Sequence, residues 1–174
     1  GSYGSSDVNN YLDERDTLVK EISSIIEVRP VTRSGNDMVL YTMDGTTLFE
    51  KSPRTVTFET VPAYDALTTG NSIYVDGVPL EAGEGANSCA GGSLQAMLQI
   101  RDDIAPMLQG QLDEIARGVV TLFAEADQSG GGGVDLPGLF TWTSGTVPTA
   151  GTRVDGMASS IVVNPAVLSS QGGD

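Results

Sequence analysis

The residue types that most often carry catalysis or bind zinc are scarce in this chain. It has one cysteine, Cys89, and no histidine among its 174 residues. A single cysteine excludes an internal disulfide and a cysteine-rich zinc site. Without histidine, neither a Ser-His-Asp nor a Cys-His arrangement is possible, and the most common general base is missing. The composition therefore points away from the commonest hydrolases and zinc enzymes.

Two glycine-rich segments resemble ligand-binding loops but lack the residues that such loops need. Residues 83–92 precede a predicted helix, yet they contain no Gly-Lys-Ser/Thr, and Ser88 interrupts a G-x-G-x-x-G pattern. We predict a hinge there. Residues 127–135 resemble a calcium loop, but they lack the alternating oxygen ligands, and Gly138 occupies the position of the bidentate glutamate. We expect no metal, cofactor-binding or catalytic site and no cofactor.

The acidic residues indicate an acidic surface and do not single out a catalytic pair. The chain has 23 acidic and 9 basic residues, for a formal net charge of −14. Two carboxylates can cleave a glycoside, but any pair chosen from 23 is arbitrary, so we predict that the protein is not an enzyme. Its negative field disfavours nucleic acid and anionic membranes. No stretch approaches the roughly 20 apolar residues of a membrane span.

Two Arg-Asp pairs, Arg15-Asp16 and Arg101-Asp102, lie in segments with helical periodicity. The segments are residues 10–26 and residues 93 to about 125, and Pro106 should kink or restart the second. An arginine beside an apolar stripe extends its charge to solvent or donates to a carboxylate of the neighbouring helix. The candidate acceptors are Asp13, Asp16, Asp102 and Asp103. We expect these pairs to pack helices rather than to bind substrate.

Between the two helical segments, short β-rich segments alternate with turn residues. The predicted strands are residues 28–32, 38–43, 47–49, 55–59 and 72–75. Asp44-Gly45 and Asp76-Gly77 are typical of the type I′ turns that join antiparallel strands. We predict a meander of about five or six strands, in which Pro30 and Pro79 place their strands toward an edge.

The predicted fold class is α+β: an antiparallel helical stalk, with one short and one long helix, and an inserted antiparallel β-meander subdomain. The predicted parts are residues 1–26 (linker and first stalk helix), 27–90 (β subdomain), 91–127 (long stalk helix) and 128–174 (loop-rich, with a short strand at 160–163). Both ends of the chain read as cuts within a longer protein.

The long helix has an apolar stripe that the short helix cannot cover, because the first segment is only about half as long. The stripe consists of Leu112, Ile115, Val119, Leu122 and Phe123. Either the C-terminal segment folds back over it or another chain covers it, since an uncovered apolar patch is usually an interaction surface. We predict that the stripe and the two Arg-Asp pairs form stalk packing or a subunit interface.

The two helical segments resemble one family. Residues 10–21, NYLDERDTLVKE, resemble the "N-D-L-L-D-x-R-D-x-L-v-x-E-l" segment of the first flagellar hook-associated protein. Residues 91–102, GGSLQAMLQIRD, are similar to that family's "G-G-x-L-x-g-L-l-x-f-R-D" segment, and QLDEIA at 111–116 to its "Q-L-d-e-L-A". One departure is at residues 126–133, which end in the glycine run 130–133, where the family often has a polar turn leading to "G-x-D".

This resemblance implies a mechanical role at the junction of flagellar hook and filament. The family is exported unfolded through the flagellar type III apparatus without a cleaved signal peptide, and an export chaperone is expected for the full-length chain. Its members assemble with themselves as a ring and contact adjacent axial proteins, the hook protein and the next junction protein. The alternative is an exported adhesin-like or carbohydrate-binding β module on a helical stalk, which predicts exposed aromatic residues clustered on one sheet face.

Overall fold

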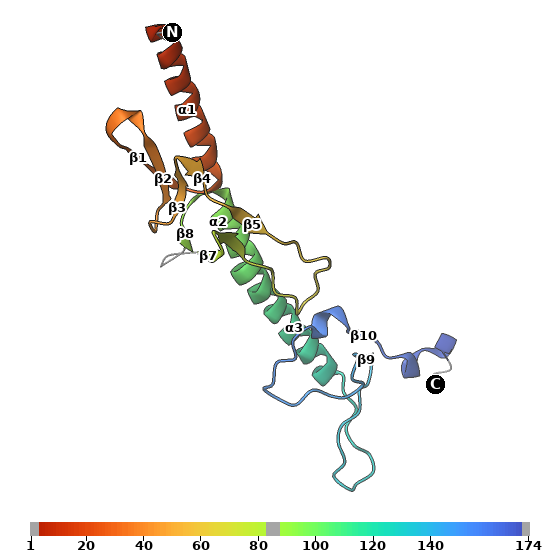
Figure 1. Ribbon diagram of the computed structural model, residues 1–174. Coiled ribbons are helices and arrows are strands. Elements are labelled where there is room, and N and C mark those ends of the chain that lie inside the picture. The colour runs from red at the N-terminus through yellow and green to blue at the C-terminus, as the bar shows by residue number, and fades with distance from the viewer. Residues whose placement is uncertain (1–3, 83–87, 172–174) are drawn as a thin grey trace. The chain divides into compact units, whose positions relative to one another are not determined.

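The computed structural model describes residues 4–82 and 88–171 (Figure 1). Helices and short antiparallel strands alternate along the chain, which confirms the predicted α+β class. The residues form two compact units: Gly1–Pro62 with Gly70–Asp103, and Ala63–Thr69 with Ile104–Asp174. Half of the predicted hinge, residues 83–87, and both outermost ends lie outside the described residues.

The first unit begins with helix α1 (Ser5–Ile25), which starts five residues before the predicted boundary. Gly4 is extended at the N-terminus, and Asp7 in the first turn complements the positive end of the helix dipole. The helix ends where Ile26 adopts extended dihedral angles, φ −133° and ψ 122°. Ile26 is buried and turns the chain into the first strand.

Two four-stranded sheets follow α1 instead of one continuous meander. The first has the order β1-β2-β3-β4, and the second has the order β5-β6-β7-β8. The strands are β1 (Val28–Thr32), β2 (Met38–Thr42), β3 (Thr47–Glu50), β4 (Ser52–Pro53), β5 (Val56–Phe58), β6 (Ile73–Val75), β7 (Val78–Ala82) and β8 (Ser88–Cys89). All these pairings are antiparallel except β7 with β8, which is parallel. The two-residue strands β4 and β8 are too short to show a period in the sequence.

The two Asp-Gly turns differ. Asp76 and Gly77 both have positive φ, 49° and 79°, and Val75 pairs directly with Val78, as in the predicted two-residue turn. At Asp44-Gly45 only the glycine has a positive φ, because the loop is longer: the ladder resumes at Tyr41 opposite Thr47. A register shift beside Tyr41 accompanies this longer loop.

The two prolines occupy different places in the sheets. Pro30 lies in β1, the edge strand of its sheet, as predicted. Pro79 lies in β7, between β6 and β8, so the prediction that it places its strand toward an edge is wrong. It is tolerated because β8 pairs only with Glu81 and Ala82, so the ladder on that side does not extend to Pro79.

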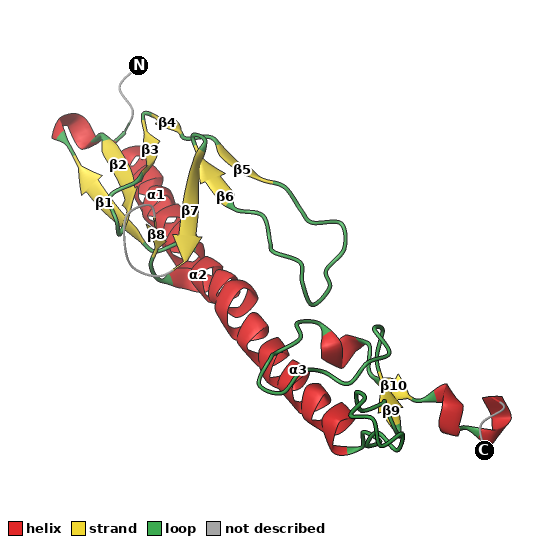
Figure 2. Ribbon diagram, turned by 90° about the horizontal axis from the view of Figure 1, so that it is seen from below, coloured by secondary structure: helices red, strands yellow, loops and turns green. Residues whose placement is uncertain are grey.

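The core of the first unit lies where α1, the strands and the second helix meet. Its buried residues are Ile26, Val28, Leu80, Cys89 and Leu98. Burial raises the pKa of the Cys89 thiol, so this cysteine behaves as a small apolar core residue rather than a nucleophile. Strand β7 lies beside helix α2 (Gly92–Gln99), as Figure 2 shows.

The Gly91-Gly92 pair permits the close contact between the two helices of the first unit. Both glycines have positive φ, 76° and 78°. A Cβ atom on Gly92 would collide with the carbonyl group of Ile25 at the end of α1, and one on Gly91 would collide with the side chain of Glu27. Only glycine meets both the conformational and the steric requirement.

Helical backbone then continues through a π-helical turn (Ile100–Ile104) into α3 (Ala105–Leu122). Pro106 is within the first two residues of α3, so the predicted restart occurs as a π turn. The wider turn accommodates a proline that lacks a backbone N–H and crowds the preceding carbonyl group.

In the second unit, the C-terminal segment packs on α3. Strand β9 (Phe140–Thr141) pairs with β10 (Val162–Val163), which shortens the strand predicted at 160–163. Short 3₁₀ turns lie at Met157–Ser159, Pro165–Val167 and Ser169–Gln171. The core consists of Ala116, Val120 and Met157, with Phe140, Trp142, Val154, Ala158 and Ile161 packed around it.

Candidate assembly surface

Helix α3 has one face that this chain covers and one that it leaves open. On the covered face, Asp113, Ala116 and Val120 are 1%, 5% and 0% exposed. Met157, in the 3₁₀ turn Met157–Ser159, is 1% exposed against this face. The spacing of three and four residues places the buried positions on one side of the helix.

Asp113 fixes this packing with hydrogen bonds as well as apolar contacts. One carboxylate oxygen accepts from the backbone N–H of Gly156 at 2.8 Å, and the other accepts from that of Ala158 at 2.8 Å. Gln109, one turn earlier on α3, donates its side-chain amide to the same carboxylate at 2.9 Å. The carboxylate thus caps the start of the 3₁₀ turn from another element, where free N–H groups attract an anion.

The environment of Asp113 keeps it ionised. Burial disfavours the charged form, but the N–H groups of Ala158 and Gly156, the amide of Gln109 and the nearby charge of Arg153 outweigh burial. Together they hold the pKa of Asp113 below its ordinary value. A helix residue therefore binds the C-terminal segment through an ionised, fully hydrogen-bonded carboxylate.

The predicted apolar stripe lies on the open side of α3. Leu112, Ile115 and Leu122 are 53%, 63% and 78% exposed, and Val119 is half-buried. Phe123 is exposed in part and packs edge-on against Phe140, with ring centroids 5.4 Å apart. The C-terminal segment does fold back, as one of the two predicted coverings requires, but over the face of Ala116 and Val120.

The open stripe has the spacing of a coiled-coil seam. With Leu108, which is also exposed, its aliphatic residues recur at 108, 112, 115, 119 and 122. These steps of four, three, four and three residues correspond to two heptads of a and d positions. The flanking Gln111 and Gly118 are uncharged, and nothing lies within 4 Å of a Cβ atom built on Gly118. Such a surface can accept a second helix at close range.

The two Arg-Asp pairs form within their own helices. Arg15 donates to Asp16 at 2.9 Å, and Arg101 donates to Asp102 at 2.6 Å. Both acceptors are among the candidates that the sequence offered, but these hydrogen bonds run to the adjacent residue, since a fork to a neighbouring carboxylate needs no second helix. Arg101 also donates to the carbonyl oxygen of Asn71 at 2.9 Å, and its side chain fills the space beside Gly70.

A network of arginines on the first sheet was not predicted. Glu50 accepts a 2.5 Å ion pair from Arg33 and pairs with Arg54 at 3.6 Å. Arg54 also pairs with Asp76 at 3.4 Å. The hydrogen bond and charge of Arg33 lower the pKa of Glu50. The sequence feature that could have indicated this network is the density of basic residues, since four of the nine lie between residues 28 and 54.

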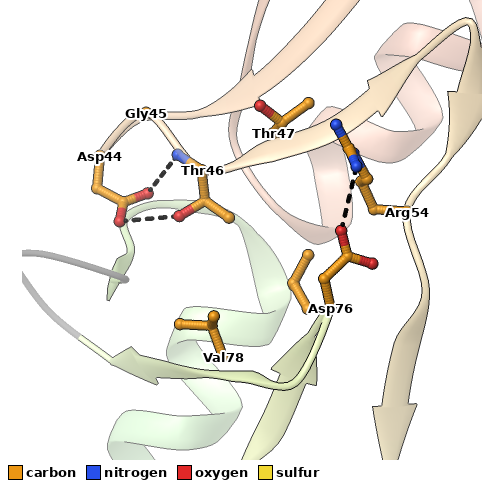
Figure 3. A pocket seen from close by; sticks show the side chains of 8 residues that line it. Asp44, Gly45, Thr46, Thr47, Arg54, Asp76 and Val78 are labelled. Carbon is orange, nitrogen blue, oxygen red and sulfur yellow. Dashed lines mark hydrogen bonds and ion pairs between the residues drawn. The ribbon is translucent and has the colours of Figure 1, made fainter.

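A depression of about 490 Å³ lies where this network meets the turns of the two sheets. Figure 3 shows Asp44 turned toward Thr46 and Arg54 turned toward Asp76 across it. Thr55 also donates its backbone N–H to Asp76 at 3.0 Å. The two carboxylates that line this depression are thus engaged in turns and ion pairs, which fits a structural role.

The loop that resembles a calcium site closes on itself. Asp127 accepts hydrogen bonds from Ser129 at 2.9 Å and 2.8 Å and from the backbone of Gly133 at 2.6 Å. These bonds lower the pKa of Asp127. Glu125 and Leu136 pair at the base of the loop. Within the described parts of the chain, no group of three acidic or cysteine residues could hold a metal ion.

Comparison with protein families adds a finding that the geometry alone does not give. The flagellar hook-associated protein FlgK helical domain matches residues 1–139 of this chain. The chain belongs to this family. Membership of this family implies a structural, hook-associated role in the bacterial flagellum. The family agrees with the one that the motifs of both helical segments resemble.

The FlgK helical-domain match contains the whole open stripe and Asp113, but it ends before Gly156 and Ala158. The covered face of α3 is thus completed by residues beyond the matched region. Neither curated proteins nor solved structures gave a match. In the stretches 4–82 and 88–171, no helix is both long and apolar enough to cross a membrane.

Proposed function

We propose that this chain is a non-catalytic subunit of the junction between flagellar hook and filament. It assembles with copies of itself as a ring and contacts adjacent axial proteins, the hook protein and the next junction protein. The observation that carries the proposal is the FlgK helical-domain match over a helix with an open, heptad-spaced apolar stripe. Such a stripe supports an assembly role because its burial requires a further helix.

Export through the flagellar type III apparatus belongs to the same proposal. The chain would pass unfolded, without a cleaved signal peptide and with a chaperone, and fold outside the cell. A single buried cysteine supports this route, because refolding would require no disulfide. The hydrogen bonds of Asp113 would form at that stage and hold the C-terminal segment on α3.

Electron microscopy of cells that lack the whole gene tests this function. We expect finished hooks without filaments, with flagellin released into the medium. Normal filaments on these cells would contradict the junction role. Complementation with the wild-type gene controls for effects on neighbouring genes.

A second complementation links the phenotype to the stripe. A gene that carries Leu112→Asp and Ile115→Asp should be exported yet fail to restore filaments, because two charges would enter the seam. Thr121→Asp, at an exposed position on the same helix outside the heptad seam, is the matched control and should restore them. Restored filaments with the stripe variant would show that these residues remain solvent-exposed in the assembly.

The alternative, an adhesin-like or carbohydrate-binding module, rests on Phe58 and Tyr74. These exposed aromatic residues line a depression of about 260 Å³ on the second sheet. Phe58 pairs with Ile73 and Tyr74 pairs with Thr57, so alternation places the two rings on opposite faces of the sheet. A flat stacking platform needs both on one face. Glycan binding that is lost in Tyr74→Ala would favour this alternative.

A further inference from the structure

The arginine network defines a basic face on the first sheet. Residues 28–54 contain four basic and three acidic residues, whereas the rest of the chain contains five basic and twenty acidic residues. This stretch therefore has a small positive charge on a strongly acidic protein. Charge contrast of this kind directs association between surfaces.

Register and hydrogen bonding place the arginines on one side of the sheet. Arg29 lies directly opposite Tyr41 in the β1–β2 ladder. Arg33, four residues after Arg29, donates to the hydroxyl oxygen of Tyr41 at 3.3 Å. Glu50, which binds both Arg33 and Arg54, lies opposite Val39, two residues from Tyr41. Residues two apart on a strand share a face, so these groups form one surface.

Part of this positive charge is uncompensated. Within the described residues, exposed Arg29 forms no ion pair or side-chain hydrogen bond. Exposed Lys51, at the β3–β4 turn, forms none there either, although its charge acts on the adjacent Glu50. Val31, between the arginines on β1, is 38% exposed. The face thus combines exposed cations with an apolar contact, as the rim of an interface and its adjoining core do.

The first unit also has the complementary surface. Helix α1 contains five acidic and two basic residues, and Asp13, Glu14 and Asp16 cluster within one turn. All three are exposed, and in the part of the chain that the structure describes only Asp16 forms an ion pair, with Arg15. Tyr11 and Leu18, 62% and 52% exposed, flank the cluster on the same helix. The acidic helix therefore also offers apolar contacts.

We propose that the basic face of the first sheet (Arg29, Arg33, Lys51 and Arg54) binds the acidic α1 surface (Asp13, Glu14 and Asp16) of a second copy of this chain. Because the two surfaces lie on different elements, each copy can use one of them on each of two neighbours, which is a heterologous contact. Repeated contacts of this type close into a ring or continue as a helix. This inference rests on the self-assembly in the proposed function and assigns it a surface distinct from the α3 stripe.

Carbodiimide cross-linking tests the contact directly, because this reagent joins amines to carboxylates without a spacer. The chain has only two lysines, Lys20 and Lys51. A mixture of isotope-labelled and unlabelled chain, cross-linked at high protein concentration, should yield mixed peptides that join Lys51 to Asp13, Glu14 or Asp16. Their yield should fall several-fold in about 1 M salt, where screening is effective within a few ångströms.

Charge variants supply the control. Arg29→Glu should remove most of the mixed cross-links, and mixing it with Glu14→Arg chain should restore part of them. Arg117→Glu makes the same charge change in the second unit, at a residue that pairs with the exposed Glu114, and should leave the yield unchanged. Chains that stay monomeric, cross-links from Lys51 only to other carboxylates, or a yield unchanged by Arg29→Glu would each overturn the inference. The junction role would fail separately, through normal filaments on cells that lack the gene.

Discussion

The two faces of α3 have a similar apolar content, yet one is buried by the C-terminal segment and the other is exposed. Ala116 and Val120 are buried under Met157, whereas Leu112 and Ile115 remain more than half exposed. The apolar side chains alone do not account for this choice. Asp113 does, because its carboxylate is aligned with the N–H groups of Gly156 and Ala158 and so fixes which face the segment covers. The directional hydrogen bonds of Asp113 thus favour one of the two apolar faces of α3 as the face that the C-terminal segment covers.

The largest effect that tests this difference between the two faces is expected for Val120→Asp. The side chain is fully buried, so the variant would place an unpaired charge in the core of the second unit. We expect a loss of at least about 3 kcal/mol in the free energy of unfolding. Urea titration followed by the fluorescence of Trp142, the only tryptophan, reports on this unit. Leu122→Asp, at a position 78% exposed, should shift the curve little; equal losses would remove the distinction between the faces.

The next largest effect is expected for Asp113→Asn. The amide has one acceptor oxygen, and its NH₂ group would face backbone N–H donors, so at least one donor would lose its partner. Loss of a hydrogen bond to a charged group costs about 1.5–3 kcal/mol. The same urea titration measures it, with Glu114→Gln as the neighbouring surface control. An unchanged midpoint would show that Asp113 does not hold the segment.

Acid should weaken the covered face through the same carboxylate. The folded-state pKa of Asp113 is below its unfolded value, so its stabilisation is complete above the unfolded pKa. That stabilisation is lost as the pH falls through the folded-state pKa. Trp142 fluorescence should therefore report a less stable second unit as the pH falls below about 4. The Asp113→Asn chain should lack this component, and identical acid profiles for both chains would contradict the assignment.

On the open face, Leu112→Asp with Ile115→Asp should change the stability of this chain by only about 0.5 kcal/mol, because both positions are mostly solvated already. Thermal unfolding measures the effect. A loss near that for Val120→Asp would mean that the stripe is covered within the chain in solution.

The smallest expected effect is that of ligands. Zinc, calcium or nucleotide should leave the melting temperature unchanged, because neither loop that resembles a ligand site has the residues that such a site needs. A shift of several degrees with calcium that disappears in Asp127→Asn would identify a metal site at the 127–135 loop. It would also add a ligand site to a second unit whose function is otherwise assigned to the two faces of α3.

Much of the fold could be predicted from local patterns. The periods of α1 and α3, the strands β1 to β3, the Asp76-Gly77 turn and the restart near Pro106 each depend on residues close in sequence. Such signals are local because backbone geometry sets the periods and proline and glycine interrupt them. The parallel β7–β8 pair and the tolerance of Pro79 within β7 depend on a two-residue strand that is too short to show a period, so no sequence pattern indicated them.

The candidate site divides in the same way. The sequence by itself determined the α+β class, the two helical motifs that indicate the hook-associated family, and the heptad-spaced apolar residues of the stripe. Only the tertiary structure decided that Asp113 binds Gly156 and Ala158, more than forty residues away, and that Arg15 pairs with its neighbour rather than across helices. Periodicity fixes which residues share a helix face, but the partner of each face depends on contacts between distant segments that no local period encodes.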